Sequence, residues 1–151
     1  MKKLLTLIVL LFALSTSNAQ IQQLNTEKPK VVGKAGGSGW NPFIASLEYF
    51  VEDSGANRYI LTYNDITYKQ LTVLKSISFK ATDDELNSLY DLLKSRVDEK
   101  NKAETTLKIG DDTVLILTSR NLGVGNIYLS VTGKGMFLLY TKTLKQLFGR
   151  D

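Results

Sequence analysis

Apolar side chains recur at every second position through much of the first half of the chain. This is the period of strands that bury one face, and polar turn segments at 54–57 and 64–65 separate the successive runs. A short run at 58–64 lies between two longer ones. In the run before it, Ala45, Leu47, Tyr49 and Val51 alternate onto one face of the strand. In the run after it, Leu71, Val73, Ile77 and Phe79 do the same. The pattern predicts an antiparallel meander.

The period changes to that of an amphipathic helix over residues 83–97. Thr82 and Glu85 have the spacing of a capping box, in which each side chain bonds the backbone N–H of the other residue. Acidic residues at 83–85 also suit the positive end of the helix dipole. The apolar stripe consists of Leu86, Leu89, Tyr90, Leu93 and Val97.

Period-two runs return at 105–109 and 113–119 around a Gly110–Asp112 turn, and again at 127–132 and 136–140 around Gly133–Gly135. The last segment predicts a short helix that ends near Gly149. Its inward residues are Leu144, Leu147 and Phe148. We therefore expect a single α+β domain at 43–151, in which one curved antiparallel sheet of about six to eight strands packs on the helix at 83–97.

The two halves of the chain share a spacing. A shift of 58 residues places Phe79 on Phe137 and Tyr90 on Phe148, so each half ends in a strand followed by an L-x-x-L-aromatic helix. A ββββα pseudo-repeat and coincidence in an apolar-rich chain are both open as explanations. If it is a repeat, the element order resembles the paired units of Whirly and PUR-type single-strand nucleic-acid binders, which implies a nucleic-acid partner.

The first 19 residues have the pattern of an export signal. Lys2 and Lys3 precede an apolar run at 4–14, about 16 Å long as a helix, and Ser17 and Ala19 supply the small residues of a cleavage site before Gln20. A short core helix or a membrane anchor is the alternative interpretation. We expect a secreted or periplasmic protein that has no membrane span after the signal is removed.

Residues 20–42 predict a flexible arm or linker, because they hold both prolines and four glycines without a regular period. The segment at 30–34 is a candidate edge strand within it. Lys28, Lys30 and Lys34 make this arm loosely basic.

The charge balance argues against nucleic acid. Removal of the signal takes two of the 19 basic residues and none of the 15 acidic ones, which leaves a net charge of +2. Such a charge gives little attraction toward polyanions, and export also separates the protein from most nucleic acid. We predict no nucleic-acid partner.

The chain contains no histidine and no cysteine, which excludes Ser-His-Asp and Cys-His catalysis, thiol redox chemistry and the usual zinc sites. We predict no cofactor, no metal and no catalytic residue. Two suitably spaced acids remain able to hydrolyse glycosides. The candidates are Glu48, Glu52, Asp53, Asp111 and Asp112, although the polar face of a strand and a hairpin turn also explain them.

The remaining indications concern binding. Trp40, the one tryptophan, either anchors the arm on the sheet or contacts a partner. Tyr59, Tyr63 and Tyr68 either form an exposed aromatic strip or, because Leu61 shares the parity of the first two, lie on a buried face. The leading hypothesis is an exported, non-catalytic binding or protein-interaction module whose partner is a protein or glycan of the cell envelope. The alternative is a carboxylate-dependent hydrolase that acts on glycans.

The export signal predicts the mature N-terminus. Protein recovered from outside the cytoplasm should begin at Gln20, and its intact mass should match residues 20–151. Material that still carries Met1 would contradict the interpretation of residues 1–19 as a cleaved signal.

Overall fold

The computed structural model describes residues 28–37, 42–52, 55–99, 101–121 and 124–150. Within these ranges, eight strands and two helices follow one another as two successive β-β-β-β-α units, so the structure has the element order of the suggested pseudo-repeat. The first unit consists of β1 (Lys30–Ala35), β2 (Ala45–Phe50), β3 (Asn57–Asn64), β4 (Leu74–Ala81) and α2 (Asp83–Asp98). The second consists of β5 (Glu104–Ile109), β6 (Asp112–Asn121), β7 (Val124–Val131), β8 (Gly135–Tyr140) and α3 (Thr141–Leu147).

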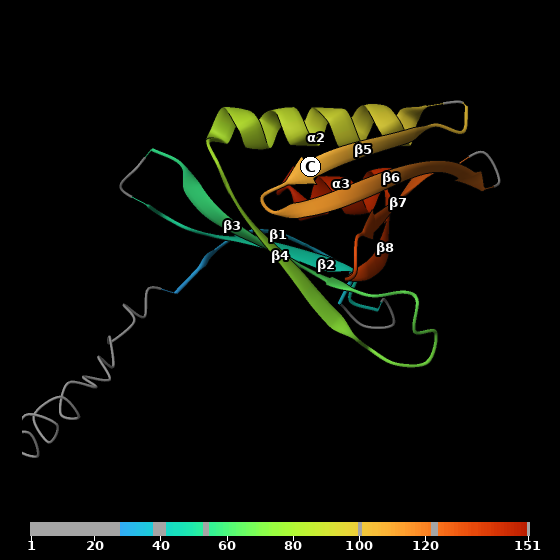
Figure 1. Ribbon diagram of the computed structural model, residues 1–151, viewed down its shortest axis with the longest axis horizontal. Helices are drawn as coiled ribbons and strands as arrows, with labels where there is room; N and C mark the ends of the chain where they lie inside the picture. The colour runs from blue at the N-terminus through green and yellow to red at the C-terminus, as the bar shows by residue number, and fades with distance from the viewer. Residues whose placement is uncertain (1–27, 38–41, 53–54, 100, 122–123, 151) are drawn as a thin grey trace, which may run out of the picture.

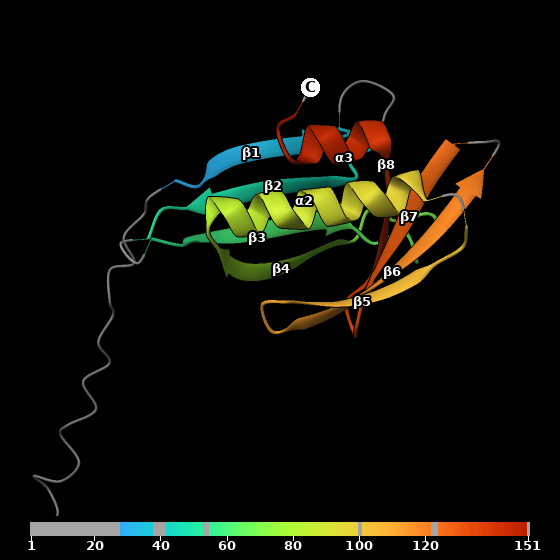
Figure 2. The same cartoon turned by 90° about the horizontal axis from the view of Figure 1, so that it is seen from above.

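The strands form two antiparallel sheets, sheet A in the order β1-β2-β3-β4 and sheet B in the order β5-β6-β7-β8. The α+β class is confirmed, but the expectation of one curved sheet packed on one helix is wrong. The chain enters α2 one residue after β4 and does not return to the free edge of β4. The strands of sheet B run at an angle to the strands of sheet A (Figures 1 and 2). Twisted four-stranded sheets pack in this way around a shared interior. Helix α2 extends along sheet A (Figure 2).

Both predicted helices are present. Thr82 caps α2 with both bonds of the capping box, Glu85 N to Thr82 Oγ1 at 3.3 Å and Thr82 N to Glu85 Oε2 at 2.8 Å. The helix buries Tyr90, Leu93 and Val97. In α3, Leu144, Leu147 and Phe148 are buried, and Gly149 ends the helix with a φ of +63°.

Two segments differ from the expected arrangement. β1 lies within the range expected to be an arm, where the candidate edge strand at 30–34 is confirmed: it pairs with β2 at the edge of sheet A, so the sheet includes residues before 43. In the other segment, β4 begins only at Leu74, because all eight residues of β3 find partners at 74–81. Residues 65–73 therefore form a loop, and Leu71, expected on an inward strand face, is 66% exposed.

One hydrophobic core joins the two sheets and both helices. Sheet A contributes the stacked rings of Tyr59 and Phe79, whose centroids are 5.5 Å apart. The rings of Tyr90 and Phe148 meet at 5.4 Å between the two helices. The residues that the 58-residue shift aligns therefore lie in one interior, and Phe79 and Phe137 are both buried there.

Each helix makes its closest backbone approach to a strand of the other unit, α2 to β7 at its C-terminal end and α3 to β1, while most of α2 lies over sheet A (Figure 2). A glycine allows each close approach. A Cβ atom on Gly125 in β7 would lie 1.9 Å from the carbonyl oxygen of Val97, at the end of α2. A Cβ atom on Gly33 in β1 would lie 2.0 Å from the carbonyl oxygen of Gln146 in α3. These two close contacts join the two units.

A buried carboxylate joins the end of β3 to the start of β8. Asp65 is 2% exposed, and its Oδ1 accepts hydrogen bonds from the backbone N–H of Thr67 at 3.0 Å, from the Thr67 hydroxyl and from the N–H of Met136 at 3.1 Å. The other oxygen lies against Gly135, where a Cβ would come within 1.9 Å. Burial alone would raise the pKa of Asp65, but these donors and nearby Lys75 hold the pKa below its usual value.

Tyr63 makes a second connection between the sheets. Its ring stacks on Phe137 with centroids 4.5 Å apart, and its hydroxyl donates a hydrogen bond of 2.9 Å to the carbonyl oxygen of Lys134. Burial, with the negative charges of Asp65 and Asp112, raises the pKa of Tyr63 to about 12. The hydroxyl therefore remains a donor at neutral pH.

Replacement of Gly125 by alanine should destabilise the protein by about 1–3 kcal/mol, because the new methyl group must displace the end of α2. Urea denaturation measures this loss, and amide hydrogen exchange in the last turn of α2 should accelerate. Gly133→Ala is the control, since a Cβ there meets no atom within 4 Å and only the backbone conformation at φ +72° is strained. Stability of Gly125→Ala equal to that of the wild type would contradict the close packing.

Asp65→Asn should destabilise the protein by about 1–3 kcal/mol at neutral pH, because it weakens hydrogen bonds to a buried ionised group. The native pKa lies below the unfolded value, so ionised Asp65 contributes its full stabilisation above the unfolded pKa and loses it as the pH falls through the native pKa. The difference between wild type and variant should therefore shrink in acid. Urea midpoints measured from neutral pH downward test this, and a constant difference would contradict it.

Candidate binding site

A groove lies where the start of α3 meets the ends of β1 and β2. Its volume is about 630 Å³, within the range of small-molecule sites. It is lined by Lys34, Gly36, Pro42, Ile44, Tyr140, Lys142, Thr143 and Gln146. We call it the α3 groove.

Local structure explains why these side chains face the groove. Lys34 lies between buried Gly33 and Ala35, so the alternation of β1 directs it outward. Tyr140 is the last residue of β8 and is 38% exposed. Its backbone N–H donates to Thr143 Oγ1 at 2.8 Å, and that hydroxyl donates to the carbonyl oxygen of Tyr140 at 3.0 Å. These two bonds fix the change of direction from β8 into α3.

The chemistry of the lining favours an anionic ligand. Lys34 and Lys142 are exposed ammonium groups, and no carboxylate is among the described residues that line the groove. The ring of Tyr140 and the side chain of Ile44 add apolar surface, while Gln146 adds donors and an acceptor. A ligand that combines a carboxylate or phosphate with a nonpolar face would match this set of groups.

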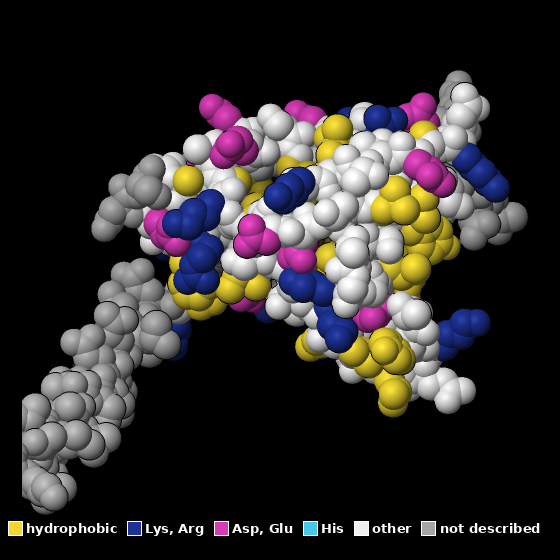
Figure 3. Space-filling model, viewed as in Figure 1, with side chains coloured by type: hydrophobic (Ala, Val, Ile, Leu, Met, Phe, Trp, Pro, Cys, Tyr) yellow, Lys and Arg dark blue, Asp and Glu magenta, His cyan; other side chains and the backbone are white. Residues whose placement is uncertain are grey.

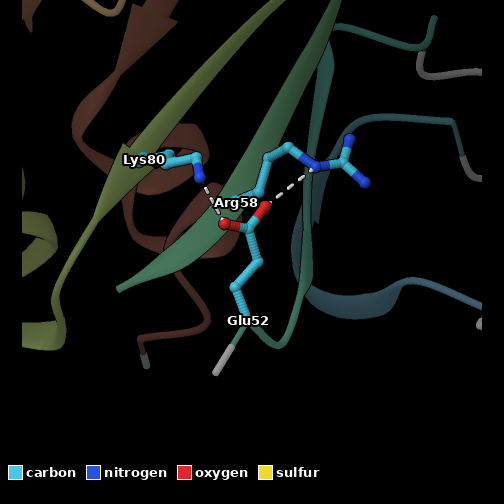
Figure 4. A network of polar contacts seen from close by, with 3 residues as sticks. All are labelled: Glu52, Arg58 and Lys80. Atoms are coloured by element: carbon cyan, nitrogen blue, oxygen red, sulfur yellow. Dashed lines mark hydrogen bonds and ion pairs between the residues drawn. The ribbon is translucent and has the colours of Figure 1, made fainter. Parts of the chain in front are cut away.

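The acids considered for catalysis lie outside the α3 groove, and one of them, Glu52, is held in ion pairs. Glu52 makes two ion pairs, from Oε1 to Arg58 Nε at 3.3 Å and from Oε2 to Lys80 Nζ at 2.5 Å (Figure 4). The hydrogen bond from Lys80, aided by the charge of Arg58, outweighs desolvation and lowers the pKa of Glu52. The Arg58 guanidinium also lies 4.3 Å from the ring centroid of Phe50. Glu52 therefore holds the ends of three neighbouring segments together as an ionised group.

The other candidate acids belong to different sheets. Glu48 lies on β2 beside Ile60 in the register, on the face opposite the core. Asp112 begins β6 and accepts a bond of 2.9 Å from Lys134 Nζ, and Asp111 is exposed in the preceding turn. Asp53 lies outside the described residues. In the part of the chain that the structure describes, no group of three or more acidic residues is placed to hold a metal ion.

Tyr59 and Tyr63 lie on a buried face and do not form an exposed aromatic strip. Tyr59 is 2% exposed and Tyr63 is 0% exposed, so both contact the core and are not available to a partner in this structure. Tyr68, at 52% exposure, is the one member of the expected aromatic strip that reaches the surface. Trp40, Ala19 and Gln20 lie outside the described residues.

Sequence reasoning did not find the α3 groove. Lys34 was noted only as part of a basic arm, and Tyr140 and Lys142 gave no signal. Residues about one hundred positions apart form the site, and their proximity follows from the packing of α3 on β1. A prediction of that contact would have been the only route to the groove.

None of the helices in the described ranges has the length and apolar character needed to cross a bilayer. Comparison of the chain with models of known protein families, with curated proteins and with solved structures finds no match.

Proposed function

We propose that this protein is exported from the bacterial cytoplasm and acts as a non-catalytic binding or protein-interaction module of the cell envelope. The export pattern of residues 1–19 supports the location. The α3 groove is the observation that carries the binding role, since the described part of its lining joins two exposed lysines and an aromatic ring without an opposing carboxylate.

The composition and the placement of the acids favour binding over catalysis. The chain lacks histidine and cysteine, so proton transfer near neutral pH would need a strongly perturbed carboxylate, lysine or tyrosine. The pKa of Glu52 is lowered and not raised, which is unfavourable for a general acid. Where the structure describes the lining of the α3 groove, it contains no carboxylate.

The proposed ligand is a carboxylate-bearing segment of an envelope glycan or protein. Ammonium groups pair with carboxylates, and a tyrosine ring packs on the nonpolar face of a sugar or on an apolar side chain. Because both lysines are exposed, the ion pairs supply selectivity and a salt-dependent affinity more than strong binding.

Titration of the isotope-labelled mature chain with soluble glycan–peptide fragments of bacterial cell wall tests this function. Amide signals of Lys34, Tyr140 and Thr143 should shift. The double variant Lys34→Glu/Lys142→Glu should weaken the association about tenfold, because two attractive charges become repulsive.

Lys94→Glu/Lys108→Glu is the matched control, since it reverses two exposed charges outside the groove. This control should bind as the wild type does. Shifts that cluster away from the groove, or equal binding by the groove variant, would contradict the proposal. Hydrolysis of the fragments during the titration would favour the glycan hydrolase instead.

A further inference from the structure

The β3–β4 loop (residues 65–73) and the first residue of β4 expose a concentration of large apolar side chains. The exposed fractions are 37% for Ile66, 52% for Tyr68, 66% for Leu71 and 55% for Leu74. These four are half of the eight large apolar side chains that are exposed in the described part of the chain. We call them the apolar tip. Such a cluster on a projecting loop indicates an interaction surface more strongly than scattered exposed residues do.

Hydrogen bonds hold the base of this loop. The N–H of Asp65 donates to the carbonyl oxygen of Val73 at 2.8 Å, and the N–H of Val73 donates to Asn64 Oδ1 at 3.0 Å. The N–H of Ile66 donates to the carbonyl oxygen of Met136 at 2.9 Å, which ties the loop to β8. A loop closed at its base presents its side chains at a lower entropic cost than a free segment.

The charges that follow Asp65 in the loop and in β4 have one sign. No acidic residue occurs between Ile66 and Thr82, whereas Lys69 and Lys75 lie within or next to the loop. Lys69 is exposed, and Lys75 is partly exposed at the second position of β4. The carboxylate of Asp65 is buried, accepts three hydrogen bonds and interacts with the charge of Lys75, so Lys69 is the positive charge of the loop that Asp65 offsets least.

The tip projects from the body of the molecule. The β3–β4 connection extends beyond both sheets at the lower right of Figure 1. In Figure 3, hydrophobic side chains form part of the same projection, and Lys or Arg side chains lie next to it together with an Asp or Glu side chain. The tip is therefore a projecting, open surface with a shallow hollow lined by Tyr68, Lys69, Gln70 and Leu71.

We propose that the apolar tip inserts into the headgroup region of an anionic membrane surface, with Leu71 deepest and Lys69 and Lys75 paired with lipid phosphates. Tyrosine and leucine are favoured at this boundary, and lysines near it gain from the surface potential. A second copy of the chain is disfavoured because two tips in contact would bring their lysines together. A protein partner is disfavoured because a nine-residue loop is small for a stable protein interface.

Vesicle co-sedimentation of the mature chain, purified after its N-terminus is established by mass, tests the proposal, because a retained leader would itself bind lipid. The protein should sediment with vesicles of equal parts phosphatidylglycerol and phosphatidylcholine more than with phosphatidylcholine alone. Leu71→Ser should reduce the partition coefficient roughly tenfold by removing an apolar side chain from the lipid boundary. Lys69→Gln/Lys75→Gln should remove most of the preference for the anionic vesicles.

Val31→Ser is the matched control. Val31 is 53% exposed on β1, at the opposite edge of sheet A from β4, and its replacement should leave sedimentation unchanged. Urea denaturation should give the same midpoint for Leu71→Ser and wild type, since the side chain is mostly exposed.

Three results would overturn the proposal. The first is equal sedimentation of Leu71→Ser and wild type, and the second is no sedimentation of the wild type with anionic vesicles. The third concerns a photo-reactive side chain placed at position 71: it would crosslink to an envelope protein or to a second copy of the chain, and not to lipid. None of these results would affect the α3 groove, which shares no residue with the apolar tip.

Discussion

The structure depends on two close contacts between its two units. An isolated four-stranded sheet would leave its apolar face uncovered, and a helix normally covers that face. Here α2 lies over sheet A (Figure 2) and also reaches β7, α3 reaches β1, and each helix approaches the strand of the other unit so closely that only glycine fits, at Gly125 and Gly33. The result is a single hydrophobic core that contains residues of both units.

Polar contacts complete this arrangement where the sheets meet. Asp65 and Tyr63 connect the end of β3 with the β7–β8 hairpin through partly buried hydrogen bonds, and the ring of Tyr63 belongs to the core. The ion pairs of Glu52, in contrast, are on the surface and hold segments of sheet A alone. Of the acids considered for catalysis, Glu52 and Asp112 therefore form ion pairs with structural roles. The proposed binding surfaces contain residues for which sequence reasoning found little signal.

The sequence predicted what depends on neighbouring residues. The Thr82 capping box, the stripe of α2, the hairpin at Gly133–Gly135 and the stop at Gly149 are all local signals, and each is present in the structure. The number of sheets was not predictable in the same way, because period-two runs give no information about which edges pair. Leu71 shows a second limit: its parity with Val73 suggested a buried strand, but the eight-residue register of β3 left it without a partner strand. The α3 groove and the close approach of α3 to β1 depend on contacts between the two ends of the chain, for which a single sequence has no signal.

The contact between β1 and α3 also determines when folding can finish. The edge strand at residues 30–35 packs against a helix that ends at residue 147, so a chain that emerges N-terminus first from a ribosome or a translocation channel must wait for its last turn before its first strand is covered. Such contacts have a high sequence separation and slow the final step of folding. The first strand therefore lacks its covering helix until residues 141–147 have been synthesised.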